Sequence, residues 1–465
     1  MFLKAMFPPP PESTPTALKP DDSDTIAWNS TTFEEVEQAI KSSSPRKAPE
    51  PDRISFLILQ KAFQAIPGLF FAIFAKLLNN GYHPICWRQA TGVILRKEGK
   101  PDYSAPKAYR IIMLLNCLGK ISEKIIATRL SKLAEVSDLL YKDQMGGRRQ
   151  RSTVDAALCL THDIQLANHH KRTLSALLLD VKGAFDHVSL NQLLKIMQDL
   201  HLPHILTKWV QLFLSDRTVS LAFDGEKDSD QKVKSGIPQG SPISPILFLI
   251  YIRFLFTQVK KQHTDSQIKI PSYIDDVAVT VEGKSAEENS IVLEKVAKSL
   301  FLWAKDNAVV FDDSKTELIH FNKDKEMAIS AVTLSNNTII NPSKVIRWLG
   351  VWFDRKLTFK DHVKKKIASA TRTLHLLHRL LSSEWGLSAA AGRQLYIACI
   401  TSISDYGCQV WFNNQKGFLN LYQKLQNSAL RKVLEAFKTS PFSAMKIEAA
   451  ICLFIMRSQK TYRLF

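Results

Sequence analysis

The chain lacks several features that would place a protein outside the cell or in a membrane. Only six of its 465 residues are cysteine, and no two of them form a C-x-x-C pair. We expect these to be reduced intracellular thiols, mostly in the core, and we expect no zinc site. The longest apolar run, from Ile246 to Phe256, contains Arg253 and is too short to span a bilayer. No membrane partner is therefore expected.

Targeting signals are also missing from the start of the sequence. The opening residues, MFLKAMFPPPPEST, lack the long apolar segment of a signal peptide. Glu12, Asp21 and Asp22 argue against a mitochondrial presequence. Residues 1–50 begin with a proline-rich, polar stretch, so we expect an N-terminal extension that is partly disordered. An intracellular location, in the cytosol or the nucleus, remains open.

Acidic residues are in the minority. The formal net charge is +18, which suggests a polyanionic partner. Residues 96–151 contain 13 basic and 6 acidic residues, a net charge of +7, and residues 344–380 contain 10 and 2, a net charge of +8. A solvated basic surface is the simpler explanation. Two basic segments on either side of an acidic motif nevertheless favour a groove for nucleic acid.

The acidic motif lies in residues 268–281, IKIPSYIDDVAVTV. Two apolar, β-branched runs predict a hairpin with Asp275 and Asp276 near its tip. Asp-Asp pairs are common in turns, and the chain has two more, Asp21-Asp22 and Asp312-Asp313, but neither is framed by strands on both sides. Adjacent carboxylates repel each other unless a cation lies between them. Oxygen ligands suit magnesium or manganese.

A third carboxylate ends another apolar strand. Leu174–Asp180 reads as a buried strand, and a buried, unpaired charge costs several kcal/mol unless a metal or a positive group lies beside it. Three carboxylates on adjacent strands can hold two cations, as in two-metal phosphoryl transfer. The sequence contains neither a Ser-His-Asp arrangement nor a Walker loop.

Two loops carry further signals. Residues 233–248, VKSGIPQGSPISPILF, form a stiff glycine- and proline-rich loop that suits contact with a base pair, or serves only as a crossover. Residues 144–153, QMGGRRQRST, either hold phosphates through amides and guanidinia or form a plain surface turn.

Hydrophobic periodicity predicts the other elements. We expect helices at residues 33–43, 54–81 with a break at Pro67-Gly68, 114–133, 190–200, 286–305 and 362–381, strands at 86–96 and 309–321, and a hairpin at 346–359. We expect four aromatic residues of the C-terminal region to be core: Trp385, Tyr396, Tyr406 and Trp411.

Several of these segments resemble known motifs. Four of them match, in order and spacing, successive motifs of reverse transcriptases: LLLDVKGAFDHV, SGIPQGSPISPILF, SYIDDVAVTV and SKTELIHF. Others resemble the non-LTR retrotransposon enzymes of the LINE type: PRKAPEPDRI, KEGKPDYSAPKAYR, LGVWFDRKLTFKDHV and LYIACITSISDYG. The resemblance covers nearly the whole chain, and the first four motifs are highly specific.

The resemblance implies roles for individual residues. Asp180, Asp275 and Asp276 would be catalytic and bind two Mg²⁺ or Mn²⁺ ions, and Lys315 would lie near the leaving phosphate as a general acid. Phe185 would exclude a 2′-hydroxyl. The remaining residues would bind the nucleotide, namely Lys97, Arg110, Gln239 and Gly240, or the nucleic acid, namely Leu349, Gly350 and the basic-helix residues Lys364, Lys365 and Lys366.

The sequence departs from the family pattern in two places. KAPEPDRI has Glu50 and Arg53 where the family has glycine, and YRIIMLL has Ile111 and Met113 where it has proline and serine. These changes affect the expected fingers and leave the acidic site whole. An endonuclease, a Cys/His knuckle and a ribonuclease H acidic set are not visible. We therefore expect a piece of a larger polyprotein, with the endonuclease in another part of the element.

We predict an α+β right-hand polymerase. Residues 51–325 would form the fingers and a palm with an antiparallel sheet, and residues 326–465 a primer-grip hairpin, a helical thumb and a C-terminal helical region. The expected reaction is the addition of deoxynucleotides to a DNA primer on an RNA template, in the nucleus. Two alternatives remain: a decayed copy that binds RNA without polymerising, and a mitochondrial protein like a group II intron maturase. The lack of a recognisable splicing domain after residue 380 favours the retrotransposon.

Overall fold

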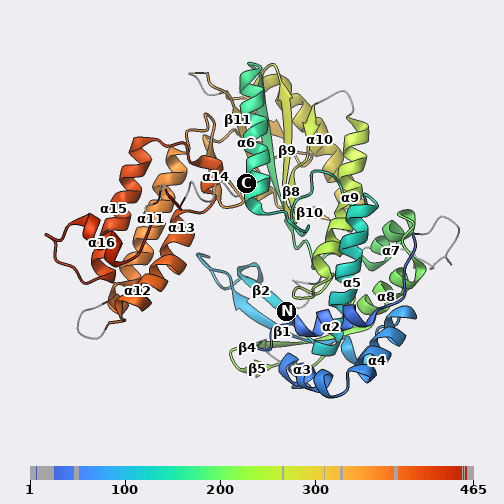
Figure 1. The fold of residues 1–465 in the computed structure, drawn as a ribbon. Coiled ribbons are helices and arrows are strands. Elements are labelled where there is room, and N and C mark those ends of the chain that lie inside the picture. The colour runs from blue at the N-terminus through green and yellow to red at the C-terminus, as the bar shows by residue number, and fades with distance from the viewer. Residues whose placement is uncertain are drawn as a thin grey trace.

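The computed structural model describes residues 7, 26–46, 52–263, 267–307, 309–324, 328–381, 386–452, 454, 456 and 457. Glu50 and Trp385 lie outside the described residues, as does most of the predicted N-terminal extension. Figure 1 shows a large sheet with its helices between two other bodies, a smaller sheet with the N-terminal helices and a group of C-terminal helices.

The large sheet has six strands, all antiparallel to their neighbours. Its order is β10-β3-β9-β7, with β11 also pairing with β3 and β8 with β9. The strands are β3 (Thr173–Lys182), β7 (Ile268–Lys269), β8 (Ser272–Tyr273), β9 (Asp276–Gly283), β10 (Val310–Phe311) and β11 (Glu317–Phe321). The predicted hairpin and the predicted strand at residues 174–180 are therefore confirmed. Residues 309–321 form two strands rather than one, and Lys315, which we expected on a strand, lies in the 3₁₀ turn Asp313–Lys315 between them.

Both faces of this sheet are buried, which explains the continuous apolar run of β3. Leu177 and Leu179 belong to a core shared with α9 (Ser244–Gln262) and α10 (Ala286–Asp306). Ala176 and Leu178 belong to a core shared with α6 (Thr153–His169) on the other face. A strand covered on both faces needs apolar side chains at every position. Rigid packing on both sides fixes where the strand ends.

The small sheet has five strands in the order β2-β1-β4-β5, with β6 also paired to β4. They are β1 (Gln89–Arg96), β2 (Tyr109–Leu115), β4 (Arg217–Phe223), β5 (Glu226–Lys227) and β6 (Gln231–Val233). Strand β1 pairs antiparallel with β2 and parallel with β4. The predicted strand at residues 86–96 is shorter than expected, because Ile85–Trp87 form a 3₁₀ turn.

The prediction that a helix begins at Leu114 is wrong. Residues 109–115 form β2, in which every second residue from Tyr109 to Leu115 is buried. The positions between them include Ile112 and Leu114, which are also apolar. The run IIMLL therefore does not show the alternation of apolar and polar residues by which a strand is recognised. Helix α5 (Cys117–Val136) begins only after Asn116, whose side chain accepts hydrogen bonds from the Leu118 and Gly119 amides.

The remaining helices of the first half pack into the core that α9 shares with the six-stranded sheet. They are α2 (Phe33–Lys41), α3 (Phe56–Ala65), α4 (Pro67–Asn79), α7 (Leu190–Asp199) and α8 (His204–Leu214). The predicted break is confirmed, since Pro67 starts α4 and the two helices meet at 112°. In the described part of the chain no single helix is long and apolar enough to span a membrane. Helices α3 and α4 have that length and apolar character only when they are taken together, and they are bent sharply where they meet.

The C-terminal region begins with two hairpins and continues as helices. The hairpins are β12 (Val332–Thr333) with β13 (Ile339–Ile340) and β14 (Val345–Trp348) with β15 (Val351–Asp354). The helices are α11 (Lys360–Leu377), α12 (Ala389–Leu395), α13 (Ser402–Ser404), α14 (Cys408–Trp411), α15 (Lys416–Val433) and α16 (Phe442–Glu448), with a π-helical turn at Tyr396–Thr401. Tyr396 and Trp411 are buried as predicted.

The expectation that the cysteines lie mostly in the core is wrong. All six are free, but only Cys117 and Cys408 are buried. Cys86, Cys159 and Cys452 are exposed. A cysteine on a helix, such as Cys159 on α6, can face solvent while its neighbours Ala157 and Leu160 face the core. Residue type alone did not reveal which face each cysteine occupies.

Candidate active site

The three predicted carboxylates lie at one end of the six-stranded sheet. Asp180 on β3 is directly opposite Asp276 on β9. Asp275 precedes β9 in the two-residue turn of the β8–β9 hairpin, and its carbonyl oxygen accepts a 3.1 Å hydrogen bond from the Val181 amide. The pairing of two buried strands therefore brings together carboxylates that are 95 positions apart in the sequence, as predicted.

The turn itself is strained. Ile274 has a φ of +60°, a left-handed conformation that a β-branched side chain rarely adopts. Gly146 packs behind it, where an added Cβ would lie 2.6 Å from the Ile274 amide nitrogen. The Met145 amide donates to the Ser272 carbonyl at 2.8 Å. The first half of the 144–153 loop therefore supports the acidic turn from behind, a role the sequence did not suggest.

Lys315 lies beside Asp180. The short segment between β10 and β11 brings its Nζ to 2.6 Å from Asp180 Oδ2 and 3.7 Å from Asp312 Oδ2. Although burial lowers the pKa of Lys315, hydrogen bonding and attraction to Asp180 and Asp312 leave it above its ordinary value. In this structure the Lys315 ammonium supplies the positive charge next to Asp180.

The other two carboxylates hold protons more tightly than usual. Burial, together with Asp275 and Asp180, raises the pKa of Asp276 to about 6. Burial also raises the pKa of Asp275, and Asp180 adds to that rise. A cation bound at this place would relieve the repulsion, since it favours the charged form of each carboxyl.

The carboxylates have the right chemistry for a divalent ion. Asp180, Asp275 and Asp276 offer only oxygen donors, as magnesium and manganese prefer. Within the described ranges, no three His, Cys, Asp or Glu side chains are gathered closely enough to hold a metal as they stand, and Asp180 is paired with Lys315 instead. The oxygen donors and the elevated pKa values of Asp275 and Asp276 fit a cation site.

Two predicted nucleotide-binding residues lie on the five-stranded sheet. Arg110, which is exposed, is on β2, and Lys97 follows β1, where its amide donates to the Ala108 carbonyl at 2.9 Å. Burial lowers the pKa of Lys97, and Arg110 and Lys315 lower it further. Arg110 in turn offsets part of the rise in the pKa of Asp275. These mutual effects indicate that the cations of the small sheet lie across from the carboxylates of the large one.

The glycine- and proline-rich loop joins the two sheets. Gln239 donates from Nε2 to both carboxylate oxygens of Asp186, at 3.0 and 3.1 Å, and its carbonyl accepts a 2.7 Å hydrogen bond from the Met113 amide on β2. Gly240 has a φ of +118°, and a Cβ there would lie 2.7 Å from the Met113 carbonyl oxygen. This loop is therefore a close-fitting connection rather than a plain crossover.

Asp186 and Arg217 are residues that the sequence motifs did not single out. Asp186 is buried, and burial raises its pKa to about 6 although Gln239, Lys97 and Arg217 favour its charged form. The buried Arg217 guanidinium donates to the Ser235 and Gly236 carbonyls at 2.6 Å. The signal was a second aspartate in GAFDHV, but nothing in the sequence paired it with Gln239.

Phe185 lies where β3 meets this loop. Its carbonyl accepts a 2.7 Å hydrogen bond from the Ile237 amide, and its half-buried ring lies 5.4 Å from that of Phe248. The ring is thus held from one side by α9 and by the loop. This placement is compatible with the predicted wall beside a nucleotide sugar.

Three of the four departures from the family pattern lie among the described residues, and the fold accommodates them. Arg53 adopts a φ of +57°, the conformation in which glycine is favoured. Ile111 and Met113 are buried on β2, and Met113 donates its amide to Gln239. Successive amides of a strand point in opposite directions, so residues two apart point the same way. The Ile111 amide therefore points away from β1, like that of Met113. A proline at position 111 would therefore break no ladder bond.

The predicted primer-contacting turn is tied to the C-terminal helices. Leu349 and Gly350, between β14 and β15, have φ values of +47° and +79°. The Tyr406 hydroxyl donates to the Leu349 carbonyl at 2.8 Å and lies 2.9 Å from Thr153 Oγ1 on α6. Tyr406 was predicted to be core, but it is half-buried and links three elements. The missed signal was its place before Gly407, whose φ is +66°.

The three lysines of α11 are not equivalent. Lys364 and Lys365 are exposed, and Lys365 Nζ lies 3.1 Å from the centroid of the Trp352 ring. Lys366 is half-buried over the Tyr406 ring, at 4.4 Å, and burial and Arg347 lower its pKa. Two of the three are therefore engaged with aromatic rings of this region.

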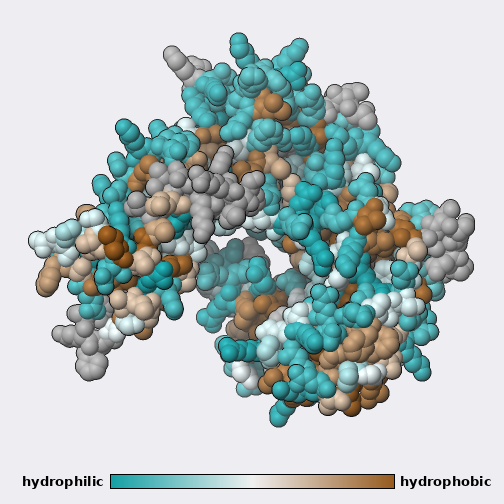
Figure 2. All heavy atoms as spheres, viewed as in Figure 1, coloured by the Kyte–Doolittle hydropathy of each residue, from teal (hydrophilic) through white to brown (hydrophobic). Residues whose placement is uncertain are grey.

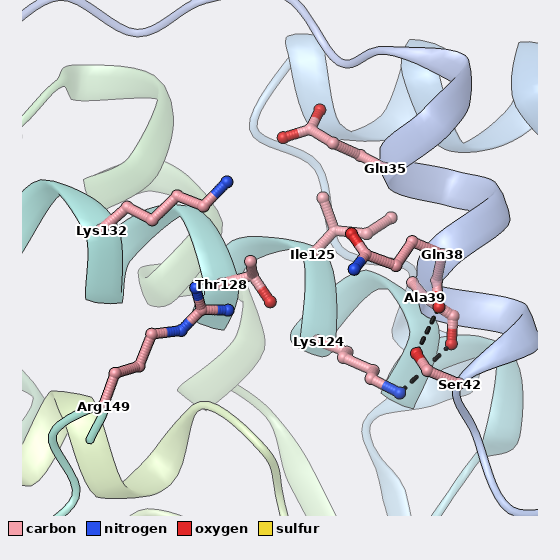
Figure 3. A pocket seen from close by; sticks show the side chains of 9 residues that line it. All are labelled: Glu35, Gln38, Ala39, Ser42, Lys124, Ile125, Thr128, Lys132 and Arg149. Atoms are coloured by element: carbon pink, nitrogen blue, oxygen red, sulfur yellow. Dashed lines mark hydrogen bonds between the residues drawn. The ribbon is translucent and has the colours of Figure 1, made fainter. Parts of the chain in front are cut away.

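The arginines of the 144–153 loop also have different roles. Arg148 Nε donates to Glu135 Oε1 at 2.8 Å, which is a structural contact. Arg149 lines a pocket of about 190 Å³ between α2 and α5, where it points toward Lys132 and Thr128 (Figure 3). Glu35 on the opposite wall is bonded to Arg129 at 2.7 Å. The pocket therefore lies between α2 and α5, and both acidic and basic side chains line it.

Comparison with known proteins agrees with this geometry. Residues 95–353 match the family described as reverse transcriptase (RNA-dependent DNA polymerase). The chain is 29% identical over 88% of its length to the RNA-directed DNA polymerase from mobile element jockey of Drosophila melanogaster, covering 44% of that protein. It is 28% identical over 86% of its length to a probable RNA-directed DNA polymerase from transposon BS of the same species, again covering 44%.

A more distant relative is the Pol polyprotein from type-1 retrotransposable element R1 of Bradysia coprophila, 26% identical over 82% of the chain and 37% of the relative. The chain spans less than half the length of these curated relatives. The family match covers more than half of the chain and includes all of the acidic site. The chain therefore belongs to the reverse transcriptase family, as its resemblance to the non-LTR retrotransposon enzymes predicted.

Proposed function

We propose that the chain is an RNA-directed DNA polymerase that adds deoxynucleotides to the 3′-hydroxyl of a DNA primer. The observation that carries this proposal is the register of β3 and β9, which sets Asp180 opposite Asp276 with Lys315 Nζ 2.6 Å from Asp180. This arrangement fits phosphoryl transfer, in which the protein mainly positions charge.

The proposal assigns the three bodies to a right hand. The six-stranded sheet would be the palm, and the five-stranded sheet with the helices before it the fingers, within residues 51–325. The β14–β15 hairpin would grip the primer, and the C-terminal helices would be the thumb and the region after it, within residues 326–465. The support is spatial, since the two flanking bodies lie on either side of the large sheet (Figure 1).

Each site residue then has a distinct task. Asp180, Asp275 and Asp276 would hold Mg²⁺ or Mn²⁺, and the bound metal supplies charge stabilisation at the attacking and leaving oxygens. Lys97 and Arg110 would bind the triphosphate from the fingers. Lys315, which keeps its proton at neutral pH, would donate it to the leaving phosphate. Phe185 would limit the space beside the sugar, and Gln239 and Gly240 would support template and nucleotide.

Two further elements of the proposal concern context. The endonuclease would come from another part of the parent element, which is consistent with a chain that covers less than half of its relatives. The site of action would be the nucleus, where a retrotransposon meets its target DNA. RNA template, DNA primer and deoxynucleoside triphosphates would be the partners.

The test is primer extension on poly(rA) with an oligo(dT) primer. We expect extension that depends on a divalent metal and is lost when Asp275 is replaced by asparagine. A decayed copy that still binds RNA would bind the template without extending the primer at millimolar nucleotide with manganese. That result would overturn the proposal and leave the family assignment intact.

A further inference from the structure

A pocket of about 380 Å³ lies between the last two helices, α15 and α16. Five of its lining residues are on α15, and one is on α16; they are Lys424, Asn427, Ser428, Arg431, Lys432 and Phe442. The spacing of these α15 residues, three and four apart, places them on one helical face. The pocket is thus a strip along α15, with Phe442 of α16 beside it.

The pocket is positive and has no acidic counterpart. Its lining contains three basic residues and no carboxylate. Residues 416–446 together contain six Lys and Arg and one acidic residue, Glu435. Helix α10, by contrast, has three lysines and four acidic residues. Helix α10 therefore balances its charge, whereas the lining of the α15 pocket carries positive charge alone.

The Arg431 guanidinium is held in place and still has an unused donor. The Arg431 guanidinium lies 4.3 Å from the centroid of the Phe442 ring, and its NH2 group donates to the Lys438 carbonyl at 3.0 Å. Among the described residues, Arg431 Nε is buried without a partner. Such a preorganised group loses little entropy when a ligand binds.

An aromatic ring is exposed next to this strip. Phe437, on the loop that connects α15 to α16, is 83% exposed. An exposed large aromatic side chain close to a basic groove is the combination by which proteins bind single-stranded nucleic acid, with cations on phosphates and rings on bases.

The strip is separate from the proposed primer and template channel. Helices α15 and α16 are drawn at the outer edge of the C-terminal helices, and α11 and α13 lie on the side nearer to the two sheets (Figure 1). Figure 2 shows hydrophilic and hydrophobic residues mixed on the visible part of this body. A ligand in the strip would therefore not need to enter the space beside the acidic site.

We propose that the α15–α16 pocket binds the phosphodiester backbone of a single-stranded nucleic acid segment outside the polymerase channel. Lys424, Arg431 and Lys432 contact phosphates, and Phe437 stacks on an unpaired base. The binding needs no polymerisation, so it can be tested even if the chain does not extend primers. RNA and single-stranded DNA share this backbone chemistry, and the experiment separates them.

The experiment measures binding of a labelled RNA strand of about 30 nucleotides, and of a DNA strand of the same sequence, to the full chain between about 50 and 300 mM salt. In the Lys424→Gln/Lys432→Gln variant, two fewer phosphates are neutralised, which should lower the salt slope by about 1.4 and weaken binding roughly tenfold near physiological salt. Phe437→Ala should weaken binding without changing the slope. Tighter binding of RNA than of DNA would identify RNA as the ligand.

A matched control removes the same charge elsewhere. Lys284→Gln/Lys298→Gln neutralises two exposed lysines far from α15 in the sequence and should leave the slope near that of the unmodified chain. The melting temperature of each variant reports on folding. A second arm adds saturating primer–template duplex, which should leave strand binding in place. Equal slopes for pocket and control variants, or complete displacement of the strand by the duplex, would overturn the proposal.

Discussion

The two sheets of this protein secure their functional residues in different ways. In the six-stranded sheet, β3 has neighbours on both sides and packed cores on both faces, so backbone register alone places Asp180 opposite Asp276. In the five-stranded sheet, β2 is an edge strand, and Arg110 on it is exposed. Carboxylates are thus fixed by the interior of one sheet, and their cationic partners by the edge and loops of the other.

This difference explains where the sequence departs from its family. Ile111 and Met113 are on the edge strand, and Arg53 lies in the segment before α3. Strands β3 and β9 show no departure at their carboxylates. Ile111 and Met113 pack into the core of the small sheet, but only one neighbouring strand must adjust to them, whereas β3 has neighbouring strands on both sides and packed cores on both faces.

The largest effect is expected when a carboxylate of the six-stranded sheet is removed. Asp180→Asn or Asp275→Asn should raise the barrier by at least about 4 kcal/mol, roughly a thousandfold in rate, because the charge that binds the metal is removed. Single-turnover primer extension measures this. Glu282→Gln, at the other end of β9, is the control and should extend normally. Near-normal extension by either aspartate variant would refute the site.

The next largest effect is expected on the selection between deoxynucleotides and ribonucleotides. Phe185→Val removes the ring that lies against Phe248, which should raise the use of ribonucleotides relative to deoxynucleotides by about tenfold, since the space beside the sugar opens. The ratio of kcat/KM for the two nucleotides measures the effect. An unchanged ratio would mean that Phe185 serves only to pack against α9.

The third prediction restores the family residues at the two departures on the edge strand β2. Ile111→Pro with Met113→Ser should lower KM for deoxynucleotides by about fivefold with less change in kcat, because proline holds φ near −65° and biases the preceding Arg110 to an extended conformation. Ile112→Pro is the matched control: its amide points toward β1, so it should break the ladder and lower the melting temperature. If the double variant behaves like this control, the edge strand is not tolerant of proline.

A smaller effect on primer–template binding is expected where Tyr406 contacts the β14–β15 turn and α6. Tyr406→Phe keeps the ring under Lys366 but removes the hydroxyl bonds to Leu349 and Thr153, worth about 1 kcal/mol. We expect KM for the primer–template to rise severalfold with kcat nearly unchanged. Tyr422→Phe removes a comparable bond to the Ser404 carbonyl and should leave KM unchanged. A similar KM in both variants would assign Tyr406 a purely structural role.

The smallest effect is expected on α11. Neutralising Lys364, Lys365 and Lys366 together should lower the salt slope of RNA–DNA hybrid binding by about one unit for each phosphate that the helix no longer neutralises. Lys364→Gln alone should give most of that change, because Lys365 and Lys366 lie over aromatic rings. An equal contribution from all three would show that the two lysines leave their rings when nucleic acid binds.

The sequence by itself determined the acidic site and much of the fold. Period-two and continuous apolar runs marked β3 and the β8–β9 hairpin, and motif order assigned Asp180, Asp275 and Asp276 before any geometry was available. It could also predict the Pro67 break and the β14–β15 turn. These features depend on local patterns, which one stretch of chain can display.

Only the tertiary structure decided the contacts that join distant segments. Strand β2 was hidden because its alternate residues are also apolar, and its identity depends on pairing with β1. The bonds of Gln239 to Asp186 and of Tyr406 to Leu349 join positions 53 and 57 residues apart. The basic strip on α15 became visible only when α16 packed against it. Sequence patterns report which residues are near in the chain, while these contacts arise from burial and packing of segments that meet only in the folded state.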